Sequence, residues 1–180
     1  MPSLLLASPQ LLDPNFAKSV VLLIEHNEQG ALGVVLNRPT SKTVRELWQE
    51  LGQPPCQSQR PVCLGGPVSG PLMAVHAAAE LAEVEIVAGA YFSAKKQHLD
   101  QLVQRPDGTL VKLFVGHAGW GPGQLEAEIE QGAWHSMPAT AENIFDEDPD
   151  LWQRLMQSLR GTELPALLKI KHIPADPRVN

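Results

Sequence analysis

The sequence has few cysteines and no long apolar run, and each shortage excludes a class of protein. Cys56 and Cys63 are the only cysteines, and their spacing is neither a CxxC redox pair nor half of a zinc site. No apolar stretch approaches the roughly 18 residues that a transmembrane helix needs. The opening MPSLLLASPQLLDPN lacks the basic region of a secretion signal. We therefore expect a cytoplasmic protein without a membrane span, whose two cysteines are reduced.

Basic charge is also scarce. The chain carries 14 Lys and Arg residues against 20 Asp and Glu residues, a net charge of −6, and its longest basic run is Lys95 and Lys96. Nonspecific binding to nucleic acid requires a basic face that neutralises phosphates. This charge balance opposes direct nucleic-acid binding. The expected partner is instead a protein or a small molecule, which the sequence does not identify.

The chain has the size and composition of one folded domain. Its 180 residues are 43% hydrophobic and 19% charged, which is typical of a globular protein with its own core. Proline and glycine are spread as turn residues and do not gather in a linker, and no internal repeat is present. We expect a single domain over residues 1–180.

Periodic patterns in the first half of the chain predict strands followed by a helix. Residues 19–39 contain two apolar runs around a short polar turn, the pattern of a β-hairpin, and residues 3–8 form another apolar run. Apolar residues then recur at helical spacing over 44–51, with Thr40 and Ser41 as the expected N-cap and Gly52 as the expected C-cap.

The second half continues with more strands and two more helices. Single strands are expected in 61–66, 71–77 and 84–93, and one central strand in 109–120. Helices are expected in 95–104 and 148–159. Adjacent strands interspersed with helices indicate an α+β fold, a single compact domain with a largely antiparallel or mixed β-sheet packed with helices.

The glycine-rich stretch GHAGWGPGQLEAEIEQGAW, residues 116–134, has both a structural and a functional interpretation. In the structural one, Trp120 ends a strand, Gly121 bends the chain and Pro122 starts a short helix. In the functional one, backbone N–H groups at the helix start bind an anion or a carbonyl oxygen, with His117 and Gln124 as partners. Most of the motif is explained structurally. It matches neither GxxxxGK[ST] nor GxGxxG, and the chain has no GxSxG.

The candidate ligand-binding residues lie at strand ends and glycine-rich turns. Arg38 follows the end of a predicted buried strand. Its side chain is available there either to a ligand or to a structural ion pair with a carboxylate such as Glu126. The full candidate set is Asn37, Arg38, Gly65, Gly66, His117, Gly119, Trp120, Gln124 and Glu126.

Neither a metal nor a cofactor is expected. His117, Glu126, Glu130 and His135 have metal-binding atoms, but no HExxH-like spacing brings them together. His26 and His76 lie on apolar strands, where hydrogen-bonded structural histidines are commoner than catalytic ones.

Four blocks of the sequence resemble the AlgH/YqgE-type family of bacterial proteins. They are ASPQLLDPNFAKSVVLLIEHNEQGALGVVLNRP, GGPV at 65–68, the 116–134 stretch and NIFDEDPDLWQRL at 143–155. The resemblance covers residues 4–159, whereas 163–180 departs from it. It implies a compact α+β domain of cytoplasmic proteins, described at most as transcriptional regulators and without an established enzymatic activity.

Two functional hypotheses remain open. The first is a noncatalytic binding or regulatory domain that acts through a protein or small-molecule partner, since no nucleophile, base and orienting group are recognisable together. The alternative is an enzyme, such as a hydrolase, that uses Arg38, His117 and Glu126. A concave pocket that collects these three side chains would favour the enzyme, whereas scattered positions favour the binding domain.

Overall fold

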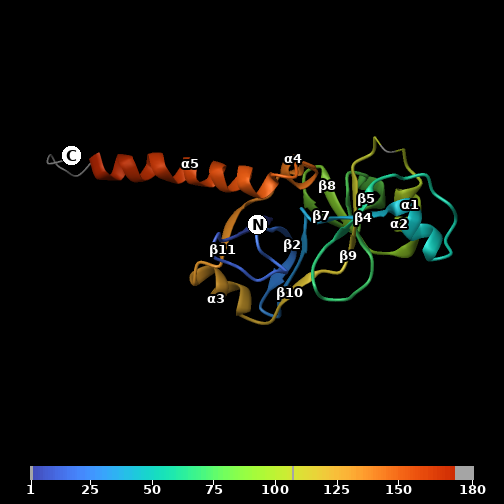
Figure 1. Ribbon diagram of the computed structural model, residues 1–180, viewed down its shortest axis with the longest axis horizontal. Helices are drawn as coiled ribbons and strands as arrows, with labels where there is room; N and C mark the ends of the chain where they lie inside the picture. Colours follow the sequence, from blue (N-terminus) through green and yellow to red (C-terminus); the bar gives the residue numbers. More distant parts are fainter. Residues whose placement is uncertain (1, 107, 173–180) are drawn as a thin grey trace.

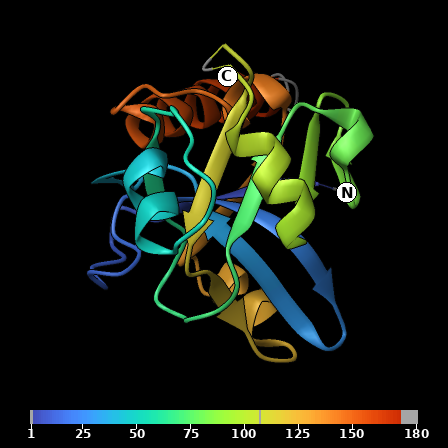
Figure 2. The same cartoon turned by 90° about the vertical axis from the view of Figure 1, so that its right-hand side faces the viewer.

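Two β-sheets packed face to face form the body of the molecule (Figures 1 and 2). The structure is a computed structural model that describes residues 2–106 and 108–172, with side chains described outside 162–172. The strand order is β10-β3-β2-β1-β11 in the first sheet and β4-β5-β9-β6-β8-β7 in the second. The α+β class with antiparallel and mixed sheets is therefore confirmed.

All neighbouring strands of the first sheet are antiparallel. Its members are β1 (Ser3–Ala7), β2 (Val20–Asn27), β3 (Gly30–Val35), β10 (Ala118–Trp120) and β11 (Trp134–Pro138). The expected hairpin in 19–39 is confirmed as β2 and β3. Side chains alternate between the faces of a strand, so Leu4 and Leu6 face the second sheet, whereas Leu5 and Ala7 face α3.

The second sheet is mixed, because β5 and β9 pair in parallel whereas its other pairs are antiparallel. Its strands are β4 (Pro39–Thr43), β5 (Pro61–Leu64), β6 (Met73–His76), β7 (Val84–Val87), β8 (Ala90–Ser93) and β9 (Val111–Val115). The helices are α1 (Val44–Glu50), the short η1 (Ala79–Leu81), α2 (Lys96–Val103), α3 (Gln124–Glu130), α4 (Ala141–Ile144) and α5 (Leu151–His172).

The alternation along the strands also explains the order of the layers. Phe114 faces the first sheet, whereas Leu113 beside it packs with Trp48 of α1 and Leu99 of α2. The layers therefore follow in the order α3, first sheet, second sheet, and α1 with α2 (Figure 1). Leu155 in the first turns of α5 joins the core between the two sheets.

The N-cap expected at Thr40 or Ser41 is wrong. Helix α1 is capped by Thr43, whose hydroxyl accepts from the backbone N–H of Glu46 while the Glu46 carboxylate accepts from the Thr43 N–H. Thr40 lies in β4, and its hydroxyl donates to the carbonyl of Val62 on β5. Residues 39–43 belong to strand β4, so the helix begins only after that strand, with Thr43 as its N-cap.

Two expected strands are each divided in the structure. Residues 84–93 form the hairpin β7 and β8, which turns at Gly89 with φ +88. Residues 109–120 break at Gly116, where φ is +78, so that β9 belongs to the second sheet and β10 to the first. Helix α5 runs beyond the expected end at residue 159 to His172, and the last part of the divergent tail, 173–180, lies outside the described residues.

His76 is a buried, hydrogen-bonded histidine of the second sheet, with 0% exposure. Its Nδ1 accepts from the N–H of Ala78 at 3.1 Å, and its Nε2 lies 2.9 Å from the hydroxyl of Ser93. That hydroxyl in turn donates to the carbonyl of Leu81 at 2.6 Å. These partners fit a neutral ring protonated on Nε2. Burial accordingly lowers the pKa of His76 below its ordinary value.

This histidine should make folding stability depend on pH. Because the pKa is lowered in the folded state, the unfolded chain takes up the proton first as the pH falls below about 6.5. We expect the free energy of unfolding to decrease between pH 7 and pH 5, measured by urea denaturation. The decrease should be smaller in His76→Gln, which removes the titrating ring. Equal slopes in the two proteins would contradict this assignment.

Candidate functional site

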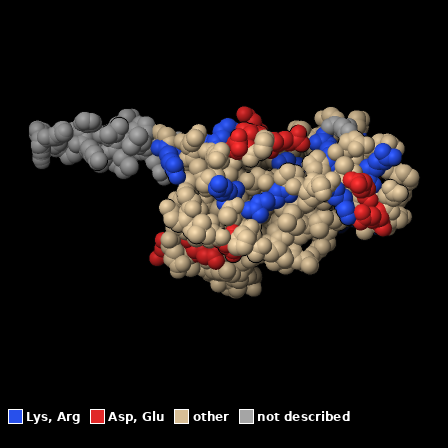
Figure 3. Space-filling model, in the orientation of Figure 1, with Lys and Arg blue, Asp and Glu red and all other residues tan. Residues whose placement is uncertain are grey.

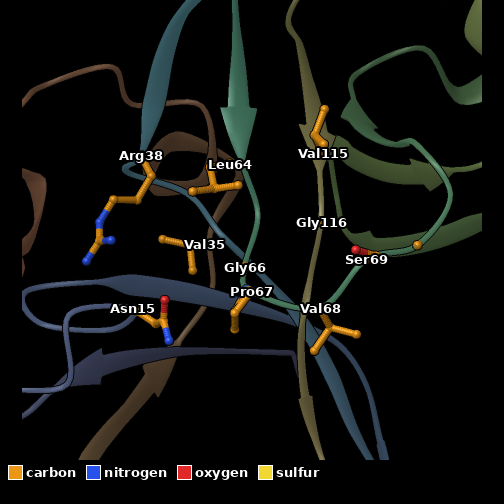
Figure 4. Close-up of a pocket in the computed structure, with 11 residues that line it drawn as sticks. Asn15, Val35, Arg38, Leu64, Gly66, Pro67, Val68, Ser69, Val115 and Gly116 are labelled. Carbon is orange, nitrogen blue, oxygen red and sulfur yellow. The ribbon is translucent and has the colours of Figure 1, made fainter.

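The first cavity lies where the two sheets meet, and its volume is about 370 Å³ (Figure 4). Strands β3, β5 and β9 and the loop 65–70 contribute its walls. It is lined by Asn15, Val35, Arg38, Leu64, Gly66, Pro67, Val68, Ser69, Gly70, Val115 and Gly116. Figure 4 shows Arg38 and Asn15 on one side of this space and Val68, Ser69 and Val115 on the other.

The loop 65–70 approaches the chain between β9 and β10 so closely that glycine is required. A Cβ on Gly66 would lie 2.2 Å from the carbonyl carbon of His117, and one on Gly65 would lie 2.3 Å from the carbonyl oxygen of Gly116. Val68 and His117 exchange two backbone hydrogen bonds of 3.0 Å. The two candidate glycines thus fix the wall of the cavity, and Gly66 also lines it.

Arg38 supplies the positive charge of the cavity. Its Nη2 donates to the carbonyl of Ala17 at 2.7 Å, and its Nη1 lies 3.5 Å from the carbonyl of Pro14. Among the described residues, no carboxylate forms a salt bridge with it. The alternative of a structural ion pair with Glu126 is therefore wrong. A guanidinium has five N–H donors, so two carbonyl contacts leave it donors for a ligand.

Apolar side chains with substantial exposure gather around this charge. Leu64, Val68 and Val115 are 46%, 43% and 39% exposed, and all three line the cavity. Contiguous exposed apolar surface beside polar groups is typical of a binding site. Sequence reasoning missed these residues, because an apolar residue at a strand end looks like a core residue until the sheet order is known.

Asn37 and His117 border the site without lining the first cavity. The side chain of Asn37 accepts from the N–H of Val20 and donates to the carbonyl of Lys18, both at 2.9 Å, so it holds the turn before β2. The ring of His117 lies against Gly70, and its Nδ1 is buried without a hydrogen-bond partner among the described residues. This leaves one buried polar atom beside the cavity wall unsatisfied.

The remaining candidates lie around α3. The Trp120 ring packs with Phe16 and Trp134, and Gln124 accepts from the N–H of Gly121 at 2.9 Å as a structural cap. Gly119 is exposed on β10 with open space around it. None of these residues lines the first cavity.

Glu126 also lies away from the cavity. Its carboxylate pairs with His26 at 3.2 Å on the surface of the first sheet and α3. Arg38, His117 and Glu126 therefore do not surround one pocket, which was the arrangement that would have favoured the enzyme hypothesis.

The basic side chains on the face in Figure 3 form no continuous patch, and the described residues hold no metal-ligating cluster. On the face in Figure 3, the basic side chains lie in separate groups interleaved with acidic ones. Within residues 2–106 and 108–161, whose side chains are described, no cluster of three or more His, Cys, Asp or Glu side chains could hold a metal ion. Within residues 2–106 and 108–172, no helix combines the length and apolar character needed to cross a membrane.

Known proteins resemble this chain over nearly its whole length. Residues 4–163 match the family described as AlgH-like. A UPF0301 protein of Myxococcus xanthus is 40% identical, covering 93% of this chain and 93% of the relative. Another from Chlorobaculum tepidum is 37% identical, with 88% and 86% covered. The solution structure of the AlgH protein from Pseudomonas aeruginosa aligns with a TM-score of 0.74 and 31% identity, over 93% of this chain and 92% of that one. The chain therefore belongs to the AlgH-like family.

Proposed function

We propose that the protein is a noncatalytic binding domain whose first cavity takes a small molecule with an anionic group on an apolar body. The observation that carries this proposal is the position of Arg38 beside the exposed Leu64, Val68 and Val115. Following the family resemblance, we assign the domain a regulatory role in the cytoplasm, with the bound molecule as the signal. The chain acts in this role as one domain.

The chemistry of the lining supports an anion in preference to a cation or a sugar. Among the described residues, no acidic side chain lines the cavity, and Arg38 is the one charged residue in its lining. A guanidinium recognises carboxylate or phosphate through paired N–H donors, and a partly desolvated site strengthens this contact. The apolar walls would bury the rest of the ligand. A volume of about 370 Å³ suits a small molecule.

Binding can be tested with three probes that share one apolar body. Hexanoate and hexyl phosphate carry an anion, whereas hexanol is the neutral match. We expect the two anions to bind, measured by titration calorimetry and by a rise in melting temperature, and hexanol to bind at least about tenfold more weakly, because it cannot form the charge-assisted contact. Equal binding of hexanol and hexanoate would refute the anionic ligand.

Variants locate the binding in this cavity. Arg38→Gln should weaken hexanoate binding at least about tenfold, whereas Arg45→Gln, which changes an exposed arginine of α1, should leave it unchanged. Because Arg38 also contacts Ala17, loss of folding in Arg38→Gln is checked by its unfolding curve. Val68→Asp provides an independent variant, since it places a negative charge on the exposed loop. Binding that survives in a folded Arg38→Gln or in Val68→Asp would exclude the first cavity.

A further inference from the structure

A second cavity, of about 340 Å³, lies on the other side of β5 from the first. Cys63 and Leu64 are neighbours on this strand and point to opposite faces, so Leu64 lines the first cavity and Cys63 the second. The second cavity is lined by Leu36, Asn37, Pro39, Arg60, Pro61, Cys63, Val111, Lys112, Asp146, Glu147, Asp148 and Pro149. The two cavities share no lining residue.

Lys112 is placed unusually for a lysine. It lies on β9 next to Leu113, which packs against α1 and α2, so alternation directs Lys112 to the face between the sheets, where Phe114 is buried. Its Nζ lies 3.4 Å from the carbonyl oxygen of Leu36 and 3.3 Å from that of Asp146. Among the described residues it forms no salt bridge, whereas Lys42 and Lys96 pair with Glu50 and Asp100.

The surroundings of Lys112 increase the fraction of its amine that is uncharged. Burial lowers the pKa of the Lys112 ammonium, and the nearby Cys63, Glu147 and Asp146 oppose this only in part. Burial raises the pKa of the Cys63 thiol, so it stays protonated at neutral pH and offers no counter-charge. The carboxylates of Asp146 and Asp148 are both engaged by Arg154.

The neutral form of the nitrogen can keep both of its contacts. A neutral amine has two N–H donors and one lone pair. Two carbonyl oxygens lie within reach of Nζ, so the neutral amine can donate to both and still have its lone pair for a reaction. A desolvated lysine amine in an apolar pocket is the usual nucleophile of Schiff-base chemistry.

We propose that the second cavity binds a small aldehyde or ketone, which condenses reversibly with the amine of Lys112. The nitrogen lone pair attacks the carbonyl carbon, and the carbonyl oxygen takes up a proton to give a carbinolamine. Loss of water then forms the C=N bond, and the two hydrogens of the amine leave on that water. The step needs neither an oxidant nor a reductant. The lining carries charges of both signs, Arg60 as well as Asp146, Glu147 and Asp148, and therefore has no excess of positive charge to attract an anion. We therefore take the ligand to be a neutral carbonyl compound, unlike that of the first cavity.

Reductive labelling with propanal and sodium cyanoborohydride at pH 7 tests this proposal in the intact protein. Peptide mass spectrometry gives a rate for each lysine and separates the α-amino group, which also reacts near neutral pH. We expect Lys112 to be labelled at least about tenfold faster than the exposed Lys18, Lys95 and Lys96, because burial lowers the pKa of Lys112 and so increases the fraction of its amine that is neutral. The preference should shrink at pH 10. Labelling of Lys112 at or below the rate of the exposed lysines overturns the proposal.

The size of the aldehyde separates reaction in the cavity from reaction at an open surface. A dextran that carries aldehyde groups is too large to enter a cavity of about 340 Å³, so the preference for Lys112 should disappear with it. A preference that is equally strong with both aldehydes would overturn binding in the cavity. An excess of hexanoate, the probe of the first cavity, should leave the propanal labelling of Lys112 unchanged. The labelling of Lys112 therefore tests the second cavity independently of the first. If hexanoate fails to bind in the first cavity, the expected labelling of Lys112 stays the same.

Discussion

Replacing Gly66 with alanine is expected to lower the free energy of unfolding by about 3 kcal/mol or more. The new Cβ would lie 2.2 Å from the carbonyl carbon and 2.3 Å from the carbonyl oxygen of His117. These atoms belong to the backbone that links the two sheets, so they cannot rotate away as a side chain would. The φ of +156 at Gly66 adds to the cost. Urea denaturation, followed by circular dichroism, measures the change.

Gly119→Ala is the matched control for this substitution. Gly119 lies three residues after Gly116 in the same glycine-rich stretch, but a Cβ there meets no atom within 4 Å, and its φ is not positive. We expect its stability to stay within about 0.5 kcal/mol of the wild type. Gly121 likewise has no positive φ, and a Cβ there would meet only the Gln124 side chain at 3.9 Å, so the positive φ values of this stretch lie at Gly116, Gly123 and Gly132 instead. If Gly66→Ala is as stable as Gly119→Ala, the loop does not pack against His117 as described.

Local patterns predicted the elements that depend on neighbouring residues. The hairpin of β2 and β3 follows from two apolar runs around a short turn, and α1 follows from its apolar spacing. The break at Gly116 was not predictable in this way, because the residues from 109 to 120 are largely apolar and a glycine adopts either sign of φ. Whether such a run continues or crosses to another sheet depends on pairing with distant strands.

Local sequence patterns also predicted only part of the candidate site, because its residues come from distant parts of the chain. Arg38 and Gly66 were identified as candidates from strand-end and turn patterns, and the structure brings both to one cavity. Glu126 was grouped with Arg38 only by residue type, and it lies with His26 instead. Lys112 was not considered at all, since a lysine within an apolar strand looks like an ordinary edge residue. Its environment is set by Leu36 and Asp146, which are far from it in sequence.

A large loss of folding stability is also expected when Glu128 of helix α3 is replaced. The sequence patterns did not single out this glutamate. One carboxylate oxygen of Glu128 accepts from the indole N–H of both Trp120 and Trp134, each at 3.0 Å, and its other oxygen accepts from Gln124 at 2.9 Å. The two indoles are 7% and 3% exposed. Glu128→Ala would leave two buried donors unpaired, and we expect it to lower the free energy of unfolding by about 2 to 4 kcal/mol.

Two further variants distinguish this hydrogen-bonding role from a general effect of charge on the helix. Glu126→Ala removes the same side chain two positions away, where it is exposed, and should leave the unfolding midpoint close to that of the wild type. Glu128→Gln keeps an acceptor oxygen for the indoles without the charge, so its stability should fall between those of Glu128→Ala and the wild type. Tryptophan fluorescence should change in Glu128→Ala and not in Glu126→Ala, because only Glu128 contacts the rings. If Glu126→Ala destabilises the protein as much as Glu128→Ala, the negative charge near the start of α3 is what stabilises it, and the hydrogen bonds to the two tryptophans contribute little.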